Sequence, residues 1–206
     1  MKLTYIGHAC FKLETLSSSL VLDPYADGTV PGLKNIRETA DLVLCSHEHR
    51  DHGARETVVL SGKRAEELPF SVQVIETFHD DAQGAKRGPN KIHIIKAEGL
   101  KIVHFGDLGC ELTEEQLTPL LDADCILIPV GGFYTIDGHQ AASIAARIGA
   151  AVTVPMHYYR EGVGYDVISG PEDFLDHFVE YDEEECSIQL SGNDDQRIVL
   201  LSPLNK

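Results

Sequence analysis

The chain has 206 residues, of which 43% are hydrophobic, so it is long enough and apolar enough to form one domain over residues 1–206 with its own core. Its 17 basic and 33 acidic residues give a formal net charge of −16. So acidic a chain repels nucleic-acid backbones and anionic lipids, which weighs against nucleic-acid and membrane partners and leaves small molecules as the expected substrates.

The sequence also argues against a membrane anchor and against export. No run of 18 apolar residues is present, as a membrane-spanning helix would require. The first fifteen residues alternate polar and apolar side chains and lack the apolar core of a signal peptide. The five cysteines are an odd number without a CxxC pair, as expected of reduced thiols. We therefore expect a cytoplasmic protein and leave homo-oligomerisation open.

The first half of the chain is predicted to consist mainly of strands. Its segments show the alternating or continuous apolar patterns that strands require. Residues 25–39 are rich in Gly, Pro and polar residues and indicate a loop, and loops of this length often serve a function. Residues 40–46 are almost wholly apolar, as expected of a strand buried on both faces. The predicted strands are residues 2–7, 10–15, 20–25, 40–46 and 70–78, followed by a hairpin over 92–107.

The second half is predicted to alternate strands and helices. Thr113 and Gln116 match a capping box at a helix start, Asp137 is a candidate cap for a second helix, and Pro171 suits the first position of a third. Helices are expected at 113–123, 139–150 and 171–180, and strands at 125–132, 151–159, 187–190 and 197–201. These elements favour two packed sheets covered by helices over one open parallel sheet.

The stretch CSHEHRDHG concentrates metal-binding side chains directly after a predicted strand. In extended backbone the side chains of residues i, i+2 and i+4 point the same way, so His47, His49 and Asp51 would converge. His52 can join them if the chain turns at Gly53. Imidazole and carboxylate ligands of this kind suit a borderline metal such as zinc. We therefore interpret the stretch as one wall of a metal site and not as a solvated polar loop.

Further ligands are expected where other strands open onto loops, the usual place for a site on a layered fold. His79 directly follows a predicted strand, Asp107 and His157 lie near the end of one, and Gly106 permits a close backbone approach beside Asp107. His8 follows the first strand in the same way and is a candidate for contact with a ligand residue or with the substrate. The remaining histidines are expected to be structural or solvated: His93, His104, His139 and His177.

The order and spacing of these residues resemble a known family. The motif HxHxDH at residues 47–52, followed by His79, by the pair Gly106–Asp107 and by His157, is similar to the metallo-β-lactamase-fold hydrolase superfamily over essentially the whole chain. The shorter stretches GHACF, FHDD, HFGDLG and PMHY resemble a compact branch of metal-dependent hydrolases related to ascorbate-6-phosphate lactonase. The resemblance implies an α/β (α+β) fold, a four-layered αββα sandwich with the site at one edge of its two sheets.

The same resemblance implies a dinuclear metal site. Its ligands would be His47, His49 and His79 for the first ion, Asp51, His52 and His157 for the second, and Asp107 as the bridge between them. The two divalent ions are expected to be zinc, with manganese, iron or nickel as alternatives, because both ligand affinity and cellular supply select the metal. Cys110 lies three residues beyond Asp107 and is expected to be a bystander.

Such a site predicts hydrolysis of a small ester, lactone or phosphodiester. Two ions about 3.5–4 Å apart can lower the pKa of a shared water toward neutrality. Asp51 is the best candidate to orient this nucleophile and to carry a proton to the leaving group. Tyr158 or Tyr159 could donate to an oxyanion, and Asp80 could fix the tautomer of the imidazole beside it. The predicted catalytic residues are Asp51, His8 and Tyr158.

Two other functions remain open. An iron-dependent oxidoreductase can use the same fold, although residue 49 is His where flavodiiron proteins have Glu, and no flavodoxin-like second domain follows. A non-catalytic metal-binding module would also need these ligands, but degenerate relatives typically lose some of them. The Tyr25–Thr39 loop is a plausible cover for the site, and its composition does not name a substrate.

Overall fold

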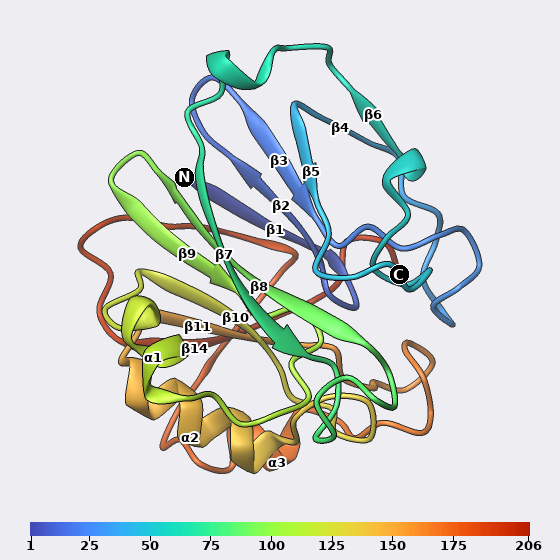
Figure 1. Ribbon diagram of the computed structural model, residues 1–206, viewed down its shortest axis with the longest axis vertical. Coiled ribbons are helices and arrows are strands. Elements are labelled where there is room, and N and C mark those ends of the chain that lie inside the picture. Colours follow the sequence, from blue (N-terminus) through green and yellow to red (C-terminus); the bar gives the residue numbers. More distant parts are fainter.

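The computed structural model describes residues Met1–Lys206 and contains two facing β-sheets with helices beside one of them (Figure 1). The first sheet has five strands in the order β13-β1-β2-β3-β5. They are β1 (Lys2–Gly7), β2 (Cys10–Glu14), β3 (Ser19–Leu22), β5 (Leu42–Leu44) and β13 (Ser187–Gln189). All neighbours pair antiparallel except β3 and β5, which are parallel.

The second sheet has seven strands in the order β12-β14-β11-β10-β9-β8-β7. They are β7 (Ser71–Phe78), β8 (Pro89–Ala97), β9 (Leu100–His104), β10 (Cys125–Pro129), β11 (Val152–Met156), β12 (Asp182–Glu184) and β14 (Arg197–Leu201). The meander from β7 to β9 is antiparallel, and the remaining pairs are parallel. Parallel neighbours need a crossover connection, which explains why the second half of the sequence alternates strands with helices.

The helices are shorter than their sequence patterns predict, with α2 as the longest. They are α1 (Glu114–Leu117), which continues into the 3-10 helix η3 (Thr118–Leu120), α2 (Gly138–Ile148) and α3 (Glu172–Leu175). The predicted capping box of Thr113 starts α1, and Pro119 then lacks the N–H that an α-helix would need. Asp137 caps α2, as its sequence position suggested. Pro171 is the N-cap of α3 and not its first residue, and this helix has a single turn.

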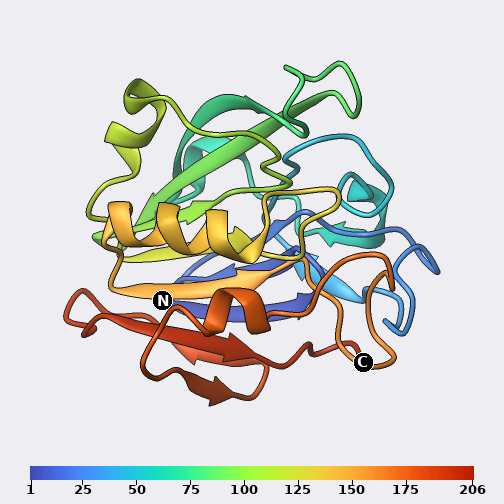
Figure 2. The same ribbon diagram turned by 90° about the horizontal axis from the view of Figure 1, so that it is seen from below.

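The main hydrophobic core lies between the sheets and under α2, which crosses the outer face of the seven-stranded sheet (Figure 2). Strand β3 shows the division of the core, because Leu20 and Leu22 join this cluster of 42 buried residues while Val21 joins a second cluster of 8. Side chains alternate across a strand, so the second cluster occupies the outer face of the five-stranded sheet.

That outer face is covered by irregular chain and a small ribbon, where the αββα pattern has helices. The cover consists of residues 23–37 and of the parallel pair β4 (Glu38–Ala40) and β6 (Val58–Leu60). Apolar side chains of these segments pack against the sheet. Short 3-10 helices lie in the same part of the chain, η1 (Arg55–Thr57) and η2 (Ala65–Glu67). The predicted sandwich of two sheets is confirmed. Its α-helices lie beside the seven-stranded sheet, and the five-stranded sheet is covered by irregular chain, the β4–β6 pair and short 3-10 helices.

Strand β5 corrects one prediction. Its residues Leu42, Val43 and Leu44 are only partly buried, so the expectation of a strand buried on both faces is wrong. The reason is its position at the edge of the five-stranded sheet, which the apolar sequence alone does not reveal.

Strands from both sheets end at the same side of the sandwich and deliver polar residues there. His8 follows β1, Asp23 follows β3, the HxHxDH segment follows β5, His79 follows β7, Asp107 follows β9 and His157 follows β11. No helix of the structure combines the length and the apolar character that crossing a membrane would require.

Candidate metal centre

One carboxylate oxygen lies at the centre of the polar cluster. Asp107 Oδ2 is 3.1 Å from His79 Nε2, 3.2 Å from His52 Nε2, 3.4 Å from His157 Nε2 and 3.8 Å from His47 Nε2. Asp107 is held from behind, because its backbone N–H donates to Asn90 Oδ1 at 2.9 Å. The preceding Gly106 has a φ of 55°, and a side chain there would collide with Ser46 and Asn90.

The other predicted ligands form two groups around this oxygen. Within each group the nearest ligand atoms all lie within 4.8 Å of one another. One group is His47, His49 and His79, and the other is His8, Asp51, His52 and His157. The structure thus brings together all seven residues that the sequence analysis named, and it adds His8 to the second group. Their action as metal ligands stays a prediction.

Several buried polar atoms of the cluster have no hydrogen-bond partner within the chain. They are both ring nitrogens of His8, Nε2 of His47 and of His52, Nδ1 of His79 and of His157, and Oδ1 of Asp107. Leaving one buried polar atom without a hydrogen-bond partner costs about 1–3 kcal/mol of stability. The large number of such atoms in this cluster therefore points to a partner that lies outside the chain. Converging imidazole nitrogens and carboxylate oxygens are ligands that zinc and similar divalent ions prefer. The residues therefore fit a divalent metal site.

Burial and mutual contacts set the protonation of these groups. Burial, followed by the effect of His157, lowers the pKa of His8 to about 4, and burial with the effect of His52 lowers the pKa of His47 to about 3. Burial acts in the same direction on His52, but the nearby carboxylates of Asp107, Asp23 and Asp51 together outweigh it and raise the pKa of His52. Neutral imidazoles are competent metal ligands, and the paired carboxylates favour a cation at their centre.

The sequence analysis missed two residues that orient the ligand side chains. Asp23 is fully buried, accepts hydrogen bonds from the N–H and hydroxyl of Ser46, and lies 2.8 Å from His52 Nδ1. Ser46 Oγ is in turn 2.9 Å from His47 Nδ1. A polar partner behind an imidazole fixes its orientation and tautomer. Asp23 directly follows β3, whereas the strand predicted over residues 20–25 had placed it inside a strand.

Asp80 does not fix an imidazole tautomer, so that prediction is wrong. Its carboxylate instead accepts hydrogen bonds of 2.7–2.9 Å from the backbone N–H groups of Ala82, Gly84, Lys86 and Arg87. Burial raises the pKa of Asp80, but these four bonds lower it to about 2. Asp80 therefore fixes the shape of the loop that follows His79.

A tyrosine hydroxyl reaches Asp51, and it belongs to Tyr165. Tyr165 Oη lies 3.3 Å from Asp51 Oδ2 and 3.2 Å from the carbonyl oxygen of Thr29. The hydroxyl of Tyr158 donates instead to the Leu201 carbonyl at 3.3 Å, and its ring belongs to the main core. The position of Tyr158 therefore does not support its predicted catalytic role. Tyr165 lies in an irregular segment without a strand-end signal, so no pattern in the sequence selects it.

His8 is held tightly inside the cluster. Its ring is 3% exposed, its Nε2 lies 3.5 Å from Asp51 Oδ2, and its ring centroid is 4.1 Å from that of His157. The backbone contributes to this arrangement, since the His157 N–H and the Tyr5 hydroxyl both donate to the His8 carbonyl. The expected contact of His8 with ligand residues is present, and its part in catalysis stays a prediction.

The segment 25–39, predicted to be a site cover, packs beside the cluster. Thr29 accepts the Tyr165 hydroxyl, and the Pro31 carbonyl accepts the N–H of Gly164 at 2.9 Å. Gly32 approaches Gly162 so closely that a side chain there would collide with the Gly162 carbonyl. The segment and residues 160–165 therefore form one wall near Asp51.

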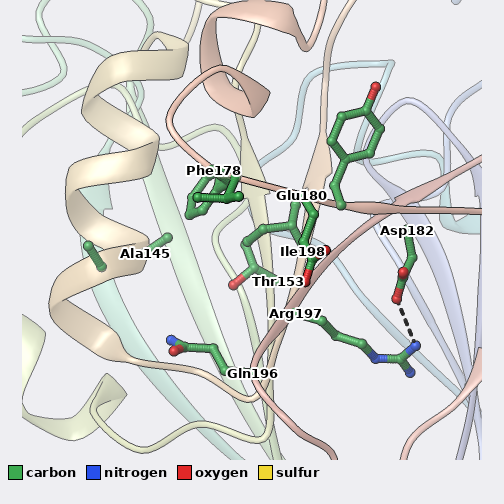
Figure 3. Close-up of a pocket in the computed structure, with 11 residues that line it drawn as sticks. Ala145, Thr153, Phe178, Glu180, Asp182, Gln196, Arg197 and Ile198 are labelled. Atoms are coloured by element: carbon green, nitrogen blue, oxygen red, sulfur yellow. Dashed lines mark hydrogen bonds and ion pairs between the residues drawn. The ribbon is translucent and has the colours of Figure 1, made fainter.

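A separate hollow of about 600 Å³ lies between α2 and the last strands (Figure 3). Phe178 and Ala145 line one side, and Arg197 pairs with Asp182 at 3.3 Å on the other. No histidine or cysteine lines this hollow, and no residue of the metal cluster borders it. The convergent imidazoles and carboxylates lie in the cluster and not in this hollow, so the chemistry is proposed to take place at the cluster.

Comparison with known proteins adds independent information. The sequence profile of the beta-lactamase superfamily domain matches residues 2–157. A UPF0173 metal-dependent hydrolase from Methanoculleus marisnigri is 29% identical over 98% of this chain and 94% of its own length. One from Korarchaeum cryptofilum is 25% identical over 86% and 90%, respectively. The crystal structure of a candidate Zn-dependent hydrolase of the metallo-beta-lactamase superfamily from Thermotoga maritima is 31% identical, covers 97% of both chains and has a TM-score of 0.77.

Proposed function

Because this chain belongs to the beta-lactamase superfamily, we propose that it is a metal-dependent hydrolase that uses two divalent ions on a small ester, lactone or phosphodiester. The observation that carries the proposal is the position of Asp107 Oδ2 among four imidazole nitrogens at 3.1–3.8 Å. This arrangement suits a carboxylate shared by two ions. The net charge of −16 favours a small substrate over a nucleic acid. The closer relation to ascorbate-6-phosphate lactonase stays a prediction.

The two groups of side chains define the proposed ligand sets. One ion would be held by His47, His49 and His79, and the other by Asp51, His52 and His157, with Asp107 shared. Bound divalent ions of this kind, zinc by preference, supply a nucleophile by lowering the pKa of water and polarise the electrophilic centre. Asp23 and Ser46 keep the rings of His52 and His47 in the orientation this requires.

Asp51 is proposed to move the proton. Burial raises the pKa of Asp51, but the contact with His8 and the charge of His52 hold it below its usual range. Its side chain is 18% exposed, whereas that of Asp107 is 2% exposed, so Asp51 is the carboxylate that a substrate can approach. The Tyr165 hydroxyl lies 3.3 Å from Asp51 Oδ2, and by turning its single hydrogen away from Asp51 and the Thr29 carbonyl it would become the proposed donor to a developing oxyanion in place of Tyr158.

A substrate screen of protein loaded with zinc or manganese tests this function. The panel contains lactones, esters, thioesters and phosphodiesters, and each is assayed with the native chain, with Asp51→Ala and with Glu48→Ala. Glu48 is a matched control, because it lies in the same motif but pairs with Arg55 at the surface. We expect hydrolysis by the native chain and by Glu48→Ala, and its loss in Asp51→Ala.

Two results would contradict the proposal. Complete inactivity of the metal-loaded native chain on the whole panel would favour the non-catalytic binding module. Iron-dependent oxygen uptake without any hydrolysis would favour the oxidoreductase.

A further inference from the structure

Most arginines of this acidic chain are neutralised by carboxylates, and Arg87 is an exception. Five of the eight arginines form ion pairs: Arg37, Arg55, Arg64, Arg147 and Arg197. Arg50 and Arg160 form none either: Arg50 borders a surface hollow that Asp27 and Glu38 also line, and Arg160 borders a small cavity that His8 and Glu161 also line. The guanidinium of Arg87 lies instead against an aromatic ring, with its Cζ 5.4 Å from the centroid of Tyr134.

Backbone hydrogen bonds fix the loop that carries Arg87 next to the metal cluster. The N–H of Arg87 donates to Asp80 Oδ2 at 2.7 Å, and Asp80 directly follows the proposed ligand His79. The chain then leads into β8, where Asn90 anchors the backbone of Asp107. The loop from residue 80 to residue 88 is therefore tied at both ends to the cluster, and Arg87 is presented by a rigid support.

Two aromatic rings connect Arg87 to Asp51. The ring centroid of Tyr134 lies 6.1 Å from that of Tyr165, and the Tyr165 hydroxyl lies 3.3 Å from Asp51 Oδ2. The segments that carry the two tyrosines are joined, because the Ser169 N–H donates to the Gly131 carbonyl at 2.7 Å. Arg87, Tyr134 and Tyr165 thus form a continuous row that ends at the proposed proton carrier.

We propose that Arg87, supported by Tyr134, binds an anionic group of the substrate, a carboxylate or a phosphate, at a distance from the bond that is hydrolysed. Arg87 is a partly buried residue, and its guanidinium, which has no carboxylate partner, retains its donors for such a group and can bind it in a bidentate manner. The neighbouring Lys86 differs, because its ammonium pairs with Asp81 at 2.6 Å. The inference rests on the proposed function and narrows its substrate to a small ester or lactone that carries a free negative group.

The first test measures specificity. Three aryl esters of similar size are compared, a monosuccinate, an ester bearing a phosphate and a neutral butyrate, with native protein, Arg87→Met, Arg87→Lys and Lys86→Met. We expect native protein to favour one of the anionic esters in kcat/KM, and Arg87→Met to lower the ratio of anionic to neutral kcat/KM about tenfold or more, which is about 1.4 kcal/mol.

The variants separate charge from geometry, and the two anionic esters separate carboxylate from phosphate. Arg87→Lys should lower the ratio less than Arg87→Met, because it keeps the charge and loses the planar fork. Lys86→Met should leave the ratio as in the native protein. The proposal is overturned if Arg87→Met changes the ratio no more than Lys86→Met does, or if native protein favours the neutral ester.

A second test distinguishes failure of this inference from failure of the proposed function. If no ester is hydrolysed, calorimetric titration of the metal-loaded protein with succinate and with inorganic phosphate measures anion binding directly. A Kd about tenfold weaker in Arg87→Met than in Lys86→Met, for either anion, supports the role of Arg87 even though the hydrolase proposal has failed. Equal Kd values in the two variants for both anions would contradict it.

Discussion

The main hydrophobic core and most of the metal cluster are buried, although His49 is exposed and Asp51 partly exposed, and different interactions stabilise the two regions. Leu127 and Val154 in the core are 0% exposed, as is His52 in the cluster, while Asp107 is 1% exposed. Apolar burial stabilises the core by about 25 cal/mol for each Å² removed from water, with or without a ligand. The cluster instead keeps unpaired nitrogens and oxygens. Its burial is therefore unfavourable until a cation occupies it, and the core must supply the stability that holds it in place.

The largest expected effect is the loss of activity in Asp107→Ala. Asp107 is the shared partner of four imidazoles, so its removal should weaken both proposed ion sites at once. We expect turnover of any substrate found in the screen to fall at least about a thousandfold, which is about 4 kcal/mol. Steady-state kinetics of metal-loaded protein measures this. Native-like turnover in Asp107→Ala would remove the central carboxylate from the mechanism.

A core substitution should show the opposite behaviour. Leu127→Ala removes a fully buried side chain of β10, and we expect it to lower the free energy of unfolding by about 2–5 kcal/mol. Chemical denaturation of the metal-free chain measures the loss, and elemental analysis under folding conditions should find native metal content. Loss of metal from folded Leu127→Ala would contradict the claim that the core contributes to stability without contributing to metal binding.

A smaller effect, on metal affinity, is expected when the residue that orients a ligand is replaced. Asp23→Asn replaces the carboxylate beside His52 Nδ1, so the ring is oriented less firmly, and we expect metal affinity to fall about 10–100-fold. Competition with a chromophoric chelator measures it. Asp41→Asn is the matched control, because Asp41 bonds to Lys63 and Ser61 away from the cluster. Equal affinities in the two variants would show that Asp23 only stabilises the fold.

The smallest effect is expected for Asp80→Asn and should be confined to the loop that follows His79. Asp80→Asn replaces one carboxylate oxygen with an N–H donor, which cannot accept the backbone N–H groups that face it. Hydrogen exchange of the amides of residues 82–87 should accelerate about tenfold or more, while the global stability changes little. Asp81→Asn, which loses only an exposed ion pair with Lys86, should leave these amides protected. Equal protection in both variants would contradict the role of Asp80.

The site residues that could be predicted from the sequence are those that lie close to a recognisable strand. The HxHxDH motif and the positions after β7, β9 and β11 each lie within a few residues of a recognisable strand, so their convergence followed from strand ends meeting at one edge. Asp23 follows β3 in the structure, but the predicted strand over residues 20–25 placed it inside a strand, so it was not selected.

Other features depend on contacts between distant segments. Tyr165 reaches Asp51 because residues 157–170 fold back over the 25–39 loop, and no sequence period encodes that approach. The strand β12 has the sequence DEE, without apolar alternation, and is defined only by its pairing with β14. The half-buried state of β5 likewise follows from its place in the sheet and not from its composition.

The most direct test of the central claim is the number of ions bound to each half of the cluster. The native chain, His49→Ala and His157→Ala are loaded with zinc, dialysed and analysed for metal, since these two histidines belong to different proposed ion sites. We expect about two ions per native chain and about one in each variant. One ion or fewer in the native chain, or native metal content in both variants, would contradict a dinuclear centre.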